Sequence, residues 1–409
     1  MSGHVGDLTP NQADLLEKFR ENVKDVLKPE QVGDDYFLTR WLRARKFDVE
    51  KAEHMYRTSM EFREKMGADT LIQDYTPPEV IQKYLTGGFC GFDKEGAPVR
   101  IELYGRLDLK GLMCSVKKSD LEKTKLLECE RSTKMCEEQS KKFGRKVDGL
   151  TVVFDMANVG TSMLWKPGMQ MYLHLVKILE DNYPEKMKRL LVVNAPRIFP
   201  LLYKLARPLV SEDMRQKIHV LGADYKHVLM KYIDEEQLPA FLGGKMCDPD
   251  GDPRCKTMIC QGGEVPHDYY LQTEELLSHM TAATIPRGEK LYLNYDVQLV
   301  GSILRWEFKT EDYDVGFGVF FKGSGGNRPV VPVTRVNSHA VAEDGSFTCK
   351  EVGTYILCFD NSFSWAKSKK VLYAAEVISA GEDVAAEIKN LVETGDWKTL
   401  SERFETTHL

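Results

Sequence analysis

Between residues 76 and 245 the sequence alternates short apolar runs with long helical stretches, and this alternation restricts the fold more than any other feature. The apolar runs are rich in β-branched residues, which favour strands. Strands that alternate with helices are typical of βαβ crossovers, in which consecutive strands run parallel. The predicted strands are 98–104, 150–155 and 190–194, and the predicted helices are 119–142 and 168–182. The sequence therefore predicts an α/β domain with a mostly parallel sheet over residues 76–245.

A helical unit is expected before this domain, over residues 1–75, because apolar residues recur there at helical spacing. Thr9-Pro10 followed by Gln12 has the pattern of an N-cap, a proline at the first helical position and a capping box. The other predicted boundaries are Pro29 as the end of the first helix, Asp34 or Asp35 as the cap of the second, and Asp48 and Gly67 as the start and end of the third. We expect a small N-terminal helical bundle.

The chain changes character after residue 245. Proline, glycine and aspartate cluster over 245–268, which predicts a linker over residues 246–274. Short runs separated by glycine-rich turns follow, as is typical of a β-sandwich, here over 275–380. The predicted strands lie near 291–300, 303–309, 315–322, 347–349, 353–359 and 370–378. The tail, 381–409, is charged and predicted to be helical. The fold class is thus multidomain, α/β plus all-β.

Composition excludes several classes of function. A net charge of −6 over 409 residues argues against a general nucleic-acid binder. No run of eighteen apolar residues and no signal-peptide pattern is present, so we expect a cytoplasmic protein. The nine cysteines are scattered, which predicts reduced thiols rather than a disulfide framework. Asp248-x-Asp250-Gly-Asp252 resembles a calcium loop but has Ile259 where a glutamate ligand is required, so a turn is predicted.

Catalytic motifs are missing from the sequence. There is no G-x-S-x-G elbow, no phosphate-binding P-loop and no H-E-x-x-H zinc motif. We expect a protein that is not an enzyme and has no metal or cofactor. A hydrolase whose catalytic groups converge from distant segments stays open, because missing motifs cannot exclude it.

Three segments carry a resemblance to a known family. They are 35–47 (DYFLTRWLRARKF), parts of 180–222 (EDNYPE and LVVNAP among them) and 239–244 (PAFLGG). In order and spacing they resemble the CRAL-TRIO lipid carriers, over about residues 8–245, and the β-rich remainder resembles a GOLD domain in order and size. The resemblance implies a carrier of a hydrophobic ligand that is held in a buried cavity and moved between membranes.

The segment 199–210 is an amphipathic helix in either of two interpretations. On periodicity alone it is a surface helix packed on a core, and Leu201, Leu202, Leu205 and Leu209 form its apolar stripe. The resemblance implies instead a gate that closes over the ligand and opens at membranes. Its membrane-facing residues would be Leu201, Lys204, Arg207 and Arg215.

Charge around this segment favours contact with anionic membranes. Residues 186–231 contain ten Lys or Arg and three Asp or Glu, a net charge of +7. The alternative is a solvated surface whose charges merely cluster in sequence.

The resemblance also implies ligand contacts. Cavity candidates are Val152, Phe154, Leu173, Phe199, Leu202, Leu205 and Leu209. A phosphoinositide headgroup would be held by Arg45, Lys46, Glu185 and Lys217. The alternative for this quartet is a structural ion-pair network between the helical unit and the sheet domain.

Family members that bind phosphatidylcholine place hydroxyl residues where this chain has Leu150 and Val152. An apolar floor does not satisfy a buried zwitterion, so the departure favours tocopherol, squalene or a retinoid. The alternative function is a phosphoinositide-dependent adaptor that recruits a protein partner through the GOLD-like domain.

Overall fold

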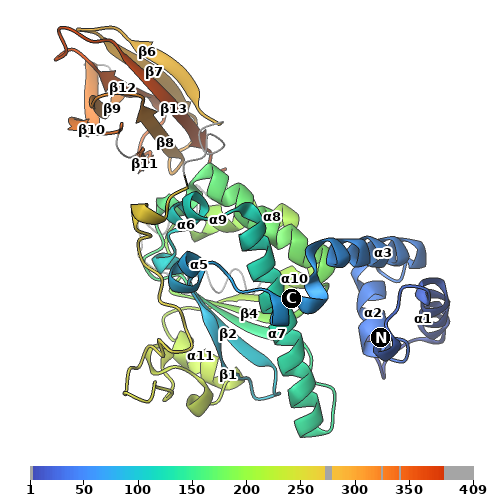
Figure 1. Cartoon of the computed structure of the whole chain (residues 1–409). Coiled ribbons are helices and arrows are strands. Elements are labelled where there is room, and N and C mark those ends of the chain that lie inside the picture. Colours follow the sequence, from blue (N-terminus) through green and yellow to red (C-terminus); the bar gives the residue numbers. More distant parts are fainter. Residues whose placement is uncertain (1–2, 272–278, 324–325, 340–341, 382–409) are drawn as a thin grey trace.

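The computed structural model describes residues 3–271, 279–323, 326–339 and 342–381, without the side chain of Leu209. A helical bundle, a sheet domain covered by helices and a β-sandwich follow one another along the chain (Figure 1). The predicted fold class is confirmed. Nearly all of the tail predicted to be helical lies outside the described residues.

The N-terminal bundle consists of α1 (Pro10–Val23), α2 (Asp35–Ala44) and α3 (Val49–Met66). Thr9 forms the predicted capping box with Gln12. Asp34, rather than Asp35, caps α2 by accepting from the Phe37 amide. Asp48 caps α3, and Gly67 ends it in the left-handed conformation at φ 64°. The prediction that α1 reaches Pro29 is wrong: the helix ends at Val23, and a turn separates it from the proline.

The central sheet has five strands in the order β1-β2-β3-β4-β5. The pairs β2–β3, β3–β4 and β4–β5 are parallel, and only β1 runs antiparallel. The strands are β1 (Gly88–Phe92), β2 (Pro98–Leu103), β3 (Leu150–Asp155), β4 (Met187–Val193) and β5 (Ile218–Val220). Strands β1 and β5 were not predicted, because one is rich in glycine and the other has three residues.

Helices connect and cover these strands. The long helices α7 and α8 match the two predicted stretches closely (Figure 1). The α-helices of the domain are α4 (Leu71–Asp74), α5 (Glu79–Tyr84), α6 (Leu109–Ser115), α7 (Lys118–Phe143), α8 (Lys166–Asn182), α9 (Phe199–Ala206), α10 (Glu212–Gln216) and α11 (Tyr225–Tyr232). Short 3-10 helices lie at Pro29–Gln31, Ala68–Thr70, Tyr104–Arg106, Thr161–Leu164, Arg207–Leu209, Glu235–Gln237, Ala240–Leu242 and His267–Tyr269.

The two faces of the sheet bury different partners. On one face Ile101, Val153 and Leu191 pack against Leu229 of α11. On the other face Val152 and Leu190 pack against Phe199 of α9. This division follows from strand geometry, because successive side chains point to opposite faces.

The segment predicted to be a linker packs along the sheet domain. Cys255 and Ile259 are fully buried in the core that contains Ile101, and Cys260 forms a bridge with Gly87. A Cβ at Gly88 would meet the Met258 carbonyl oxygen at 1.9 Å, so the close approach of this segment requires glycine there. Residues 246–271 are therefore an ordered strap rather than a free connection.

The C-terminal domain is a sandwich of two four-stranded antiparallel sheets, β10-β9-β12-β7 and β11-β8-β13-β6. Phe308, Phe317 and Phe359 lie in its core. The strands are β6 (Thr281–Ile285), β7 (Lys290–Val297), β8 (Ile303–Thr310), β9 (Val315–Gly323), β10 (Gly326–Val336), β11 (Glu343–Thr348), β12 (Gly353–Asp360) and β13 (Lys369–Ile378). Strands β6 and β10 were not predicted.

Within the described residues, no helix has the length and apolar character needed to cross a membrane. In the same part of the chain, no three His, Cys, Asp or Glu side chains are grouped so that they could hold a metal ion.

Candidate functional site

The face of the sheet under α9 is an apolar floor. Parallel register places Val152 of β3 beside Leu190 of β4, and Phe154 beside Val192. Val152 is 3% exposed, and Leu150 is half-buried in the same cluster. Both positions where a hydroxyl would be expected for a phosphatidylcholine ligand therefore carry hydrocarbon on the α9 side.

Helix α9 closes over this floor. Pro200 near its start favours a helical turn, and Phe199 and Leu202 pack on the cluster that contains Val152. The ring of Tyr203 stacks on that of Phe199 with centroids 6.2 Å apart. These side chains form one apolar side of α9, and that side packs on the floor. Helix α9 therefore covers the floor.

The predicted cavity residues divide into three groups. Val152, Phe154, Phe199 and Leu202 come together in the floor cluster. Leu205 packs in a second cluster, on the side of α9 toward the sandwich. Leu173 of α8 is half-buried outside these clusters, and the side chain of Leu209 lies outside the described residues.

A polar edge of the floor was missed in the sequence analysis. Arg100 and Glu102 of β2 lie beside Val152 and Phe154 in register, and both are more than nine-tenths buried. Arg100 Nε donates to Glu102 at 2.8 Å, and Lys125 of α7 pairs with the same carboxylate at 3.2 Å. The signal was present in the run PVRIELY, where charged residues alternate with apolar ones within a buried strand.

Two tyrosines extend this polar edge toward α8. Tyr104 packs edge-on against Phe154, with ring centroids 4.7 Å apart, and lies 6.2 Å from the ring of Tyr172. Burial raises the pKa of both hydroxyls. Burial also raises the pKa of Glu102, but the charges of Arg100 and Lys125 outweigh it and keep the carboxyl ionised. Glu128 also pairs with Arg100 and Lys125, so this edge of the floor has neutral hydroxyls and an ion cluster without net charge.

The opposite side of α9 faces the β-sandwich. Leu201, predicted to face the membrane, is fully buried with Ile303 and Ala380. Lys204 is exposed, but its ammonium donates to the Ala380 carbonyl at 3.2 Å. In this structure the predicted membrane face of α9 is therefore covered in part by the C-terminal domain.

The two predicted membrane-facing arginines lie in different settings. Arg207 is exposed. Arg215 donates to the carbonyls of Val210 and Arg207, so it fastens the end of the gate segment rather than projecting from it.

The predicted headgroup quartet is only partly assembled. Glu185 accepts from Arg43 Nε at 2.7 Å, and Lys217 pairs with Asp213. Arg45 lines a groove of about 670 Å³ between α3 and α8, and Lys46 is exposed. The headgroup role of these four residues stays a prediction.

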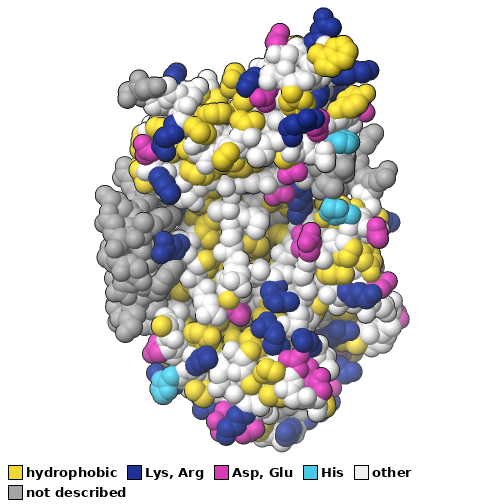
Figure 2. Space-filling view, turned by 90° about the vertical axis from the view of Figure 1, so that its left-hand side faces the viewer, with side chains coloured by type: hydrophobic (Ala, Val, Ile, Leu, Met, Phe, Trp, Pro, Cys, Tyr) yellow, Lys and Arg dark blue, Asp and Glu magenta, His cyan; other side chains and the backbone are white. Residues whose placement is uncertain are grey.

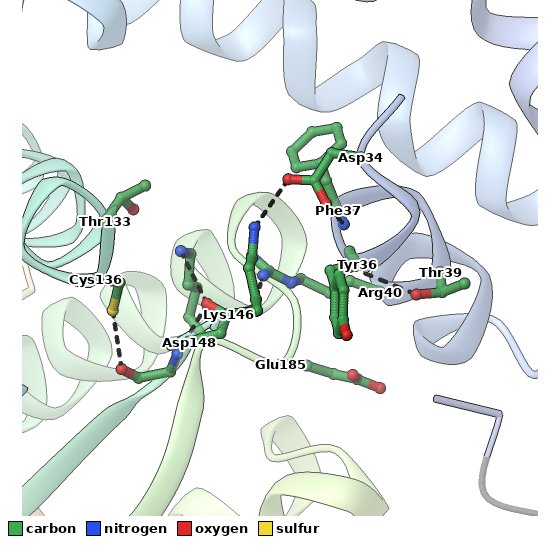
Figure 3. Close-up of polar contacts among 12 residues, drawn as sticks. Asp34, Tyr36, Phe37, Thr39, Arg40, Thr133, Cys136, Lys146, Asp148 and Glu185 are labelled. Atoms are coloured by element: carbon green, nitrogen blue, oxygen red, sulfur yellow. Dashed lines mark hydrogen bonds and ion pairs between the residues drawn. The ribbon is translucent and has the colours of Figure 1, made fainter. Parts of the chain in front are cut away.

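Ion pairs join the helical bundle to the sheet domain beside Glu185 (Figure 3). Arg40 of α2 binds Asp148, and Lys146 donates to Asp34 at 2.9 Å. Burial raises the pKa of Asp148, but the charges of Arg40 and Lys186 outweigh it and lower the pKa to about 2. These contacts have the form of the structural network that the sequence left open.

The basic charge of residues 186–231 is partly neutralised in three dimensions. Lys188 and Arg189 pair with Asp93 and Glu95, which lie far earlier in the chain. Lys186, Arg215 and Lys217 also have carboxylate partners. Figure 2 shows Lys and Arg side chains among Asp and Glu side chains on the face it displays. The charge excess in the sequence therefore overstates the basic surface.

The chain is similar to known proteins over both its helical bundle and its sheet domain. Residues 82–244 match the CRAL/TRIO domain, and residues 13–57 match the CRAL/TRIO N-terminal domain. "Protein real-time" of Aedes aegypti is 33% identical over 336 residues, which cover 78% of this chain and 50% of that protein. "CRAL-TRIO domain-containing protein T23G5.2" of Caenorhabditis elegans is 33% identical over 341 residues, or 80% of this chain and 46% of that protein. The chain spans about half the length of these relatives. The crystal structure of Sfh5 aligns with a TM-score of 0.45 and 16% identity, covering 59% of this chain and 89% of that one.

Proposed function

The chain belongs to the CRAL-TRIO family of lipid-binding and transfer proteins, and from this premise we propose that it carries one hydrophobic molecule between membranes. The ligand lies between the sheet floor and α9, and α9 moves aside for exchange. The observation that carries the proposal is the apolar stripe of α9, Phe199 and Leu202, closed over Val152.

The composition of the floor supports a ligand that is mostly hydrocarbon. Burial of apolar ligand surface gains roughly 25 cal/mol per Å², so an isoprenoid chain binds with few polar contacts. Tyr104 and Tyr172 at one edge provide hydrogen bonds for a single hydroxyl or carbonyl. Tocopherol and retinoids have one such polar end, and squalene has none.

Phosphatidylinositol is the less favoured cargo. Glu185 already accepts from Arg43, and Lys217 already pairs with Asp213, so an inositol headgroup would have to displace these partners. We propose that the protein works in the cytoplasm, binds anionic membranes briefly and catalyses no bond chemistry. Lys204 and Arg207 at the surface of α9 support the membrane contact.

Analysis of the native cargo tests the proposal. Protein purified from its native tissue is extracted with organic solvent, and the extract is examined by mass spectrometry. A stoichiometric isoprenoid supports the carrier, and its movement from protein to phospholipid vesicles gives a direct assay. An empty protein that moves neither tocopherol, squalene nor retinol would contradict it.

The adaptor alternative gives a different result in the same experiment. An adaptor would contain phosphatidylinositol and bind a protein partner even after the cavity is emptied. Turnover of a lipid ester would instead indicate a hydrolase.

A further inference from the structure

The β-sandwich and the sheet floor hold α9 from opposite sides. Leu201 is fully buried against Ile303 and Ala380 of the sandwich region, and Phe199 packs against the floor. Leu202 contacts both clusters. Helix α9 therefore cannot leave the floor without either carrying the sandwich with it or separating Leu201 from Ile303.

A buried carboxylate fastens the sandwich next to α9. Glu307 of β8 has a side chain that is 4% exposed, and it accepts from Trp165 Nε1 at 2.7 Å. Lys110 of α6 pairs with the same carboxylate at 3.0 Å and with Asp344 at 2.7 Å. Trp165 and Lys110 belong to the sheet domain, so these contacts cross between domains.

Two further contacts hold the chain just before α8. Arg305 of β8 donates to the Leu164 carbonyl, and Ser346 of β11 bonds to Thr161. Leu164 also joins the apolar cluster around Leu201. The polar and apolar contacts thus form one continuous junction, which we call the sandwich junction: Leu201, Ile303, Ala380, Glu307, Trp165, Lys110, Arg305 and Leu164.

Separating this junction has a cost in free energy. Glu307 keeps His279 of its own domain but loses Trp165 and Lys110 when the domains part, and the apolar side chains of Leu201 and Ile303 become exposed to water. A packed junction of this kind has two states, docked and undocked, rather than a range of intermediate positions.

We propose that the β-sandwich is a latch on α9: ligand exchange requires the sandwich junction to separate, so that docking keeps α9 closed over the floor. The latch rests on the proposed function because α9 is taken as the cover of the ligand. A membrane or partner that binds the undocked sandwich better than the docked one would release α9 by shifting this equilibrium.

Hydrogen exchange of the full-length protein tests the latch without reference to any ligand. The variant is Glu307→Gln, which removes one charge at the junction. The matched control is Glu311→Gln, which removes one carboxylate charge from an exposed pair with Lys370 in the same sandwich. We expect the α9 amides, residues 199–206, to exchange at least about tenfold faster in Glu307→Gln. Losing one partner of a buried charge pair costs more free energy than a tenfold change in exchange rate requires. The control should leave α9 as in the wild type.

Small-angle X-ray scattering reports docking independently, and Glu307→Gln/Ile303→Ala is the second, stronger variant. An undocked sandwich with unchanged α9 exchange overturns the latch. A sandwich that stays docked in both variants overturns the assignment of these contacts. A fluorescent tocopherol analogue then measures release to phosphatidylcholine vesicles, which should accelerate with α9 exchange. Faster α9 exchange in a protein that carries no lipid would show that docking holds α9 in place, but it would refute the carrier and, with it, the role of the junction in ligand exchange.

Discussion

The sheet domain meets the helical bundle and the β-sandwich at two junctions that differ in their relation to α9. The bundle junction combines charge pairs, Arg40–Asp148, Arg43–Glu185 and Lys146–Asp34, with an apolar contact of Phe62 and Met66 of α3 against Ile178 of α8. The sandwich junction combines one buried carboxylate with an apolar contact on α9. Both junctions thus mix charge pairs with apolar packing, but only the sandwich junction includes a side chain of the cover helix. We therefore expect the sandwich, and not the bundle, to control the release of α9.

The largest expected effect comes from the apolar half of the sandwich junction. Leu201→Ala should lower the free energy of unfolding by about 3 kcal/mol, because a fully buried leucine loses its transfer free energy and leaves a cavity. Denaturant unfolding followed by a probe in the sandwich measures it. Leu205→Ala on the same helix is the control and should cost less, because Leu205 is only half-buried. Equal costs would mean that Leu201 does not anchor the sandwich.

Acid should weaken the sandwich junction, and only well below neutral pH. Burial raises the pKa of Glu307, but His279, Lys110 and Trp165 outweigh it and lower the pKa to about 2 from an ordinary value of 4.5. His279 stays with Glu307 when the sandwich undocks, so only the part of this depression that Lys110 and Trp165 cause stabilises docking; that contribution is present above pH 4.5 and is lost as the pH falls toward 2. Scattering profiles should therefore be unchanged from pH 8 to pH 5. Opening of the sandwich at pH 6 would contradict the assignment.

Removing the most buried cation among the charge pairs of the bundle junction, Arg40, should have a smaller effect. Arg40→Ala removes a side chain that is 8% exposed from Asp148, which keeps Lys186 as a partner. We expect a loss of about 2 kcal/mol in unfolding free energy, and less than about 1 kcal/mol for the more exposed Lys146→Ala. The exchange rate of α9 should not change in either variant. Faster α9 exchange in Arg40→Ala would show that the bundle also controls the cover.

Val152→Thr tests whether the ligand lies on the apolar floor under α9. The new hydroxyl loses water without a fixed partner, so affinity for tocopherol should fall by about 1–2 kcal/mol. Titration of the purified, delipidated protein measures this loss. Thr151→Val, on the other face of the same strand, is the control and should leave affinity unchanged if it folds. Unchanged affinity in Val152→Thr would mean that the ligand does not lie on this floor.

The smallest effect concerns the surface charge of α9. Arg207→Gln should slow transfer between anionic vesicles by a few-fold, since one basic residue near the surface contributes roughly 1 kcal/mol. Transfer between neutral vesicles should not change. Lys204→Gln also loses the bond to the Ala380 carbonyl, so it should in addition speed α9 exchange slightly. If Arg207→Gln and Lys204→Gln had the same effects on transfer and on α9 exchange, Lys204 would have no separate role in docking.

Much of the fold follows from the sequence because it depends on local patterns. The cap at Thr9 and the cap at Asp48 act within one helical turn, and both were predicted correctly. Strand β3 was predicted with its exact ends, 150–155, because its run of β-branched residues is bounded by a glycine and an aspartate. The resemblance to the family was likewise found in short sequence motifs, each of which is local.

The candidate site is different, because its partners are distant in sequence. Periodicity places Leu201 on the apolar side of α9, but it does not say whether lipid, membrane or protein covers that side. Lys204 has its carbonyl partner 176 residues away, and Arg43 reaches Glu185 across 142 residues. Charge counted along the chain likewise missed the pairing of Lys188 with Asp93. Local rules therefore determined which segments form helices and strands, and only tertiary packing decided which side chains meet, because burial and pairing depend on the neighbours that folding brings together.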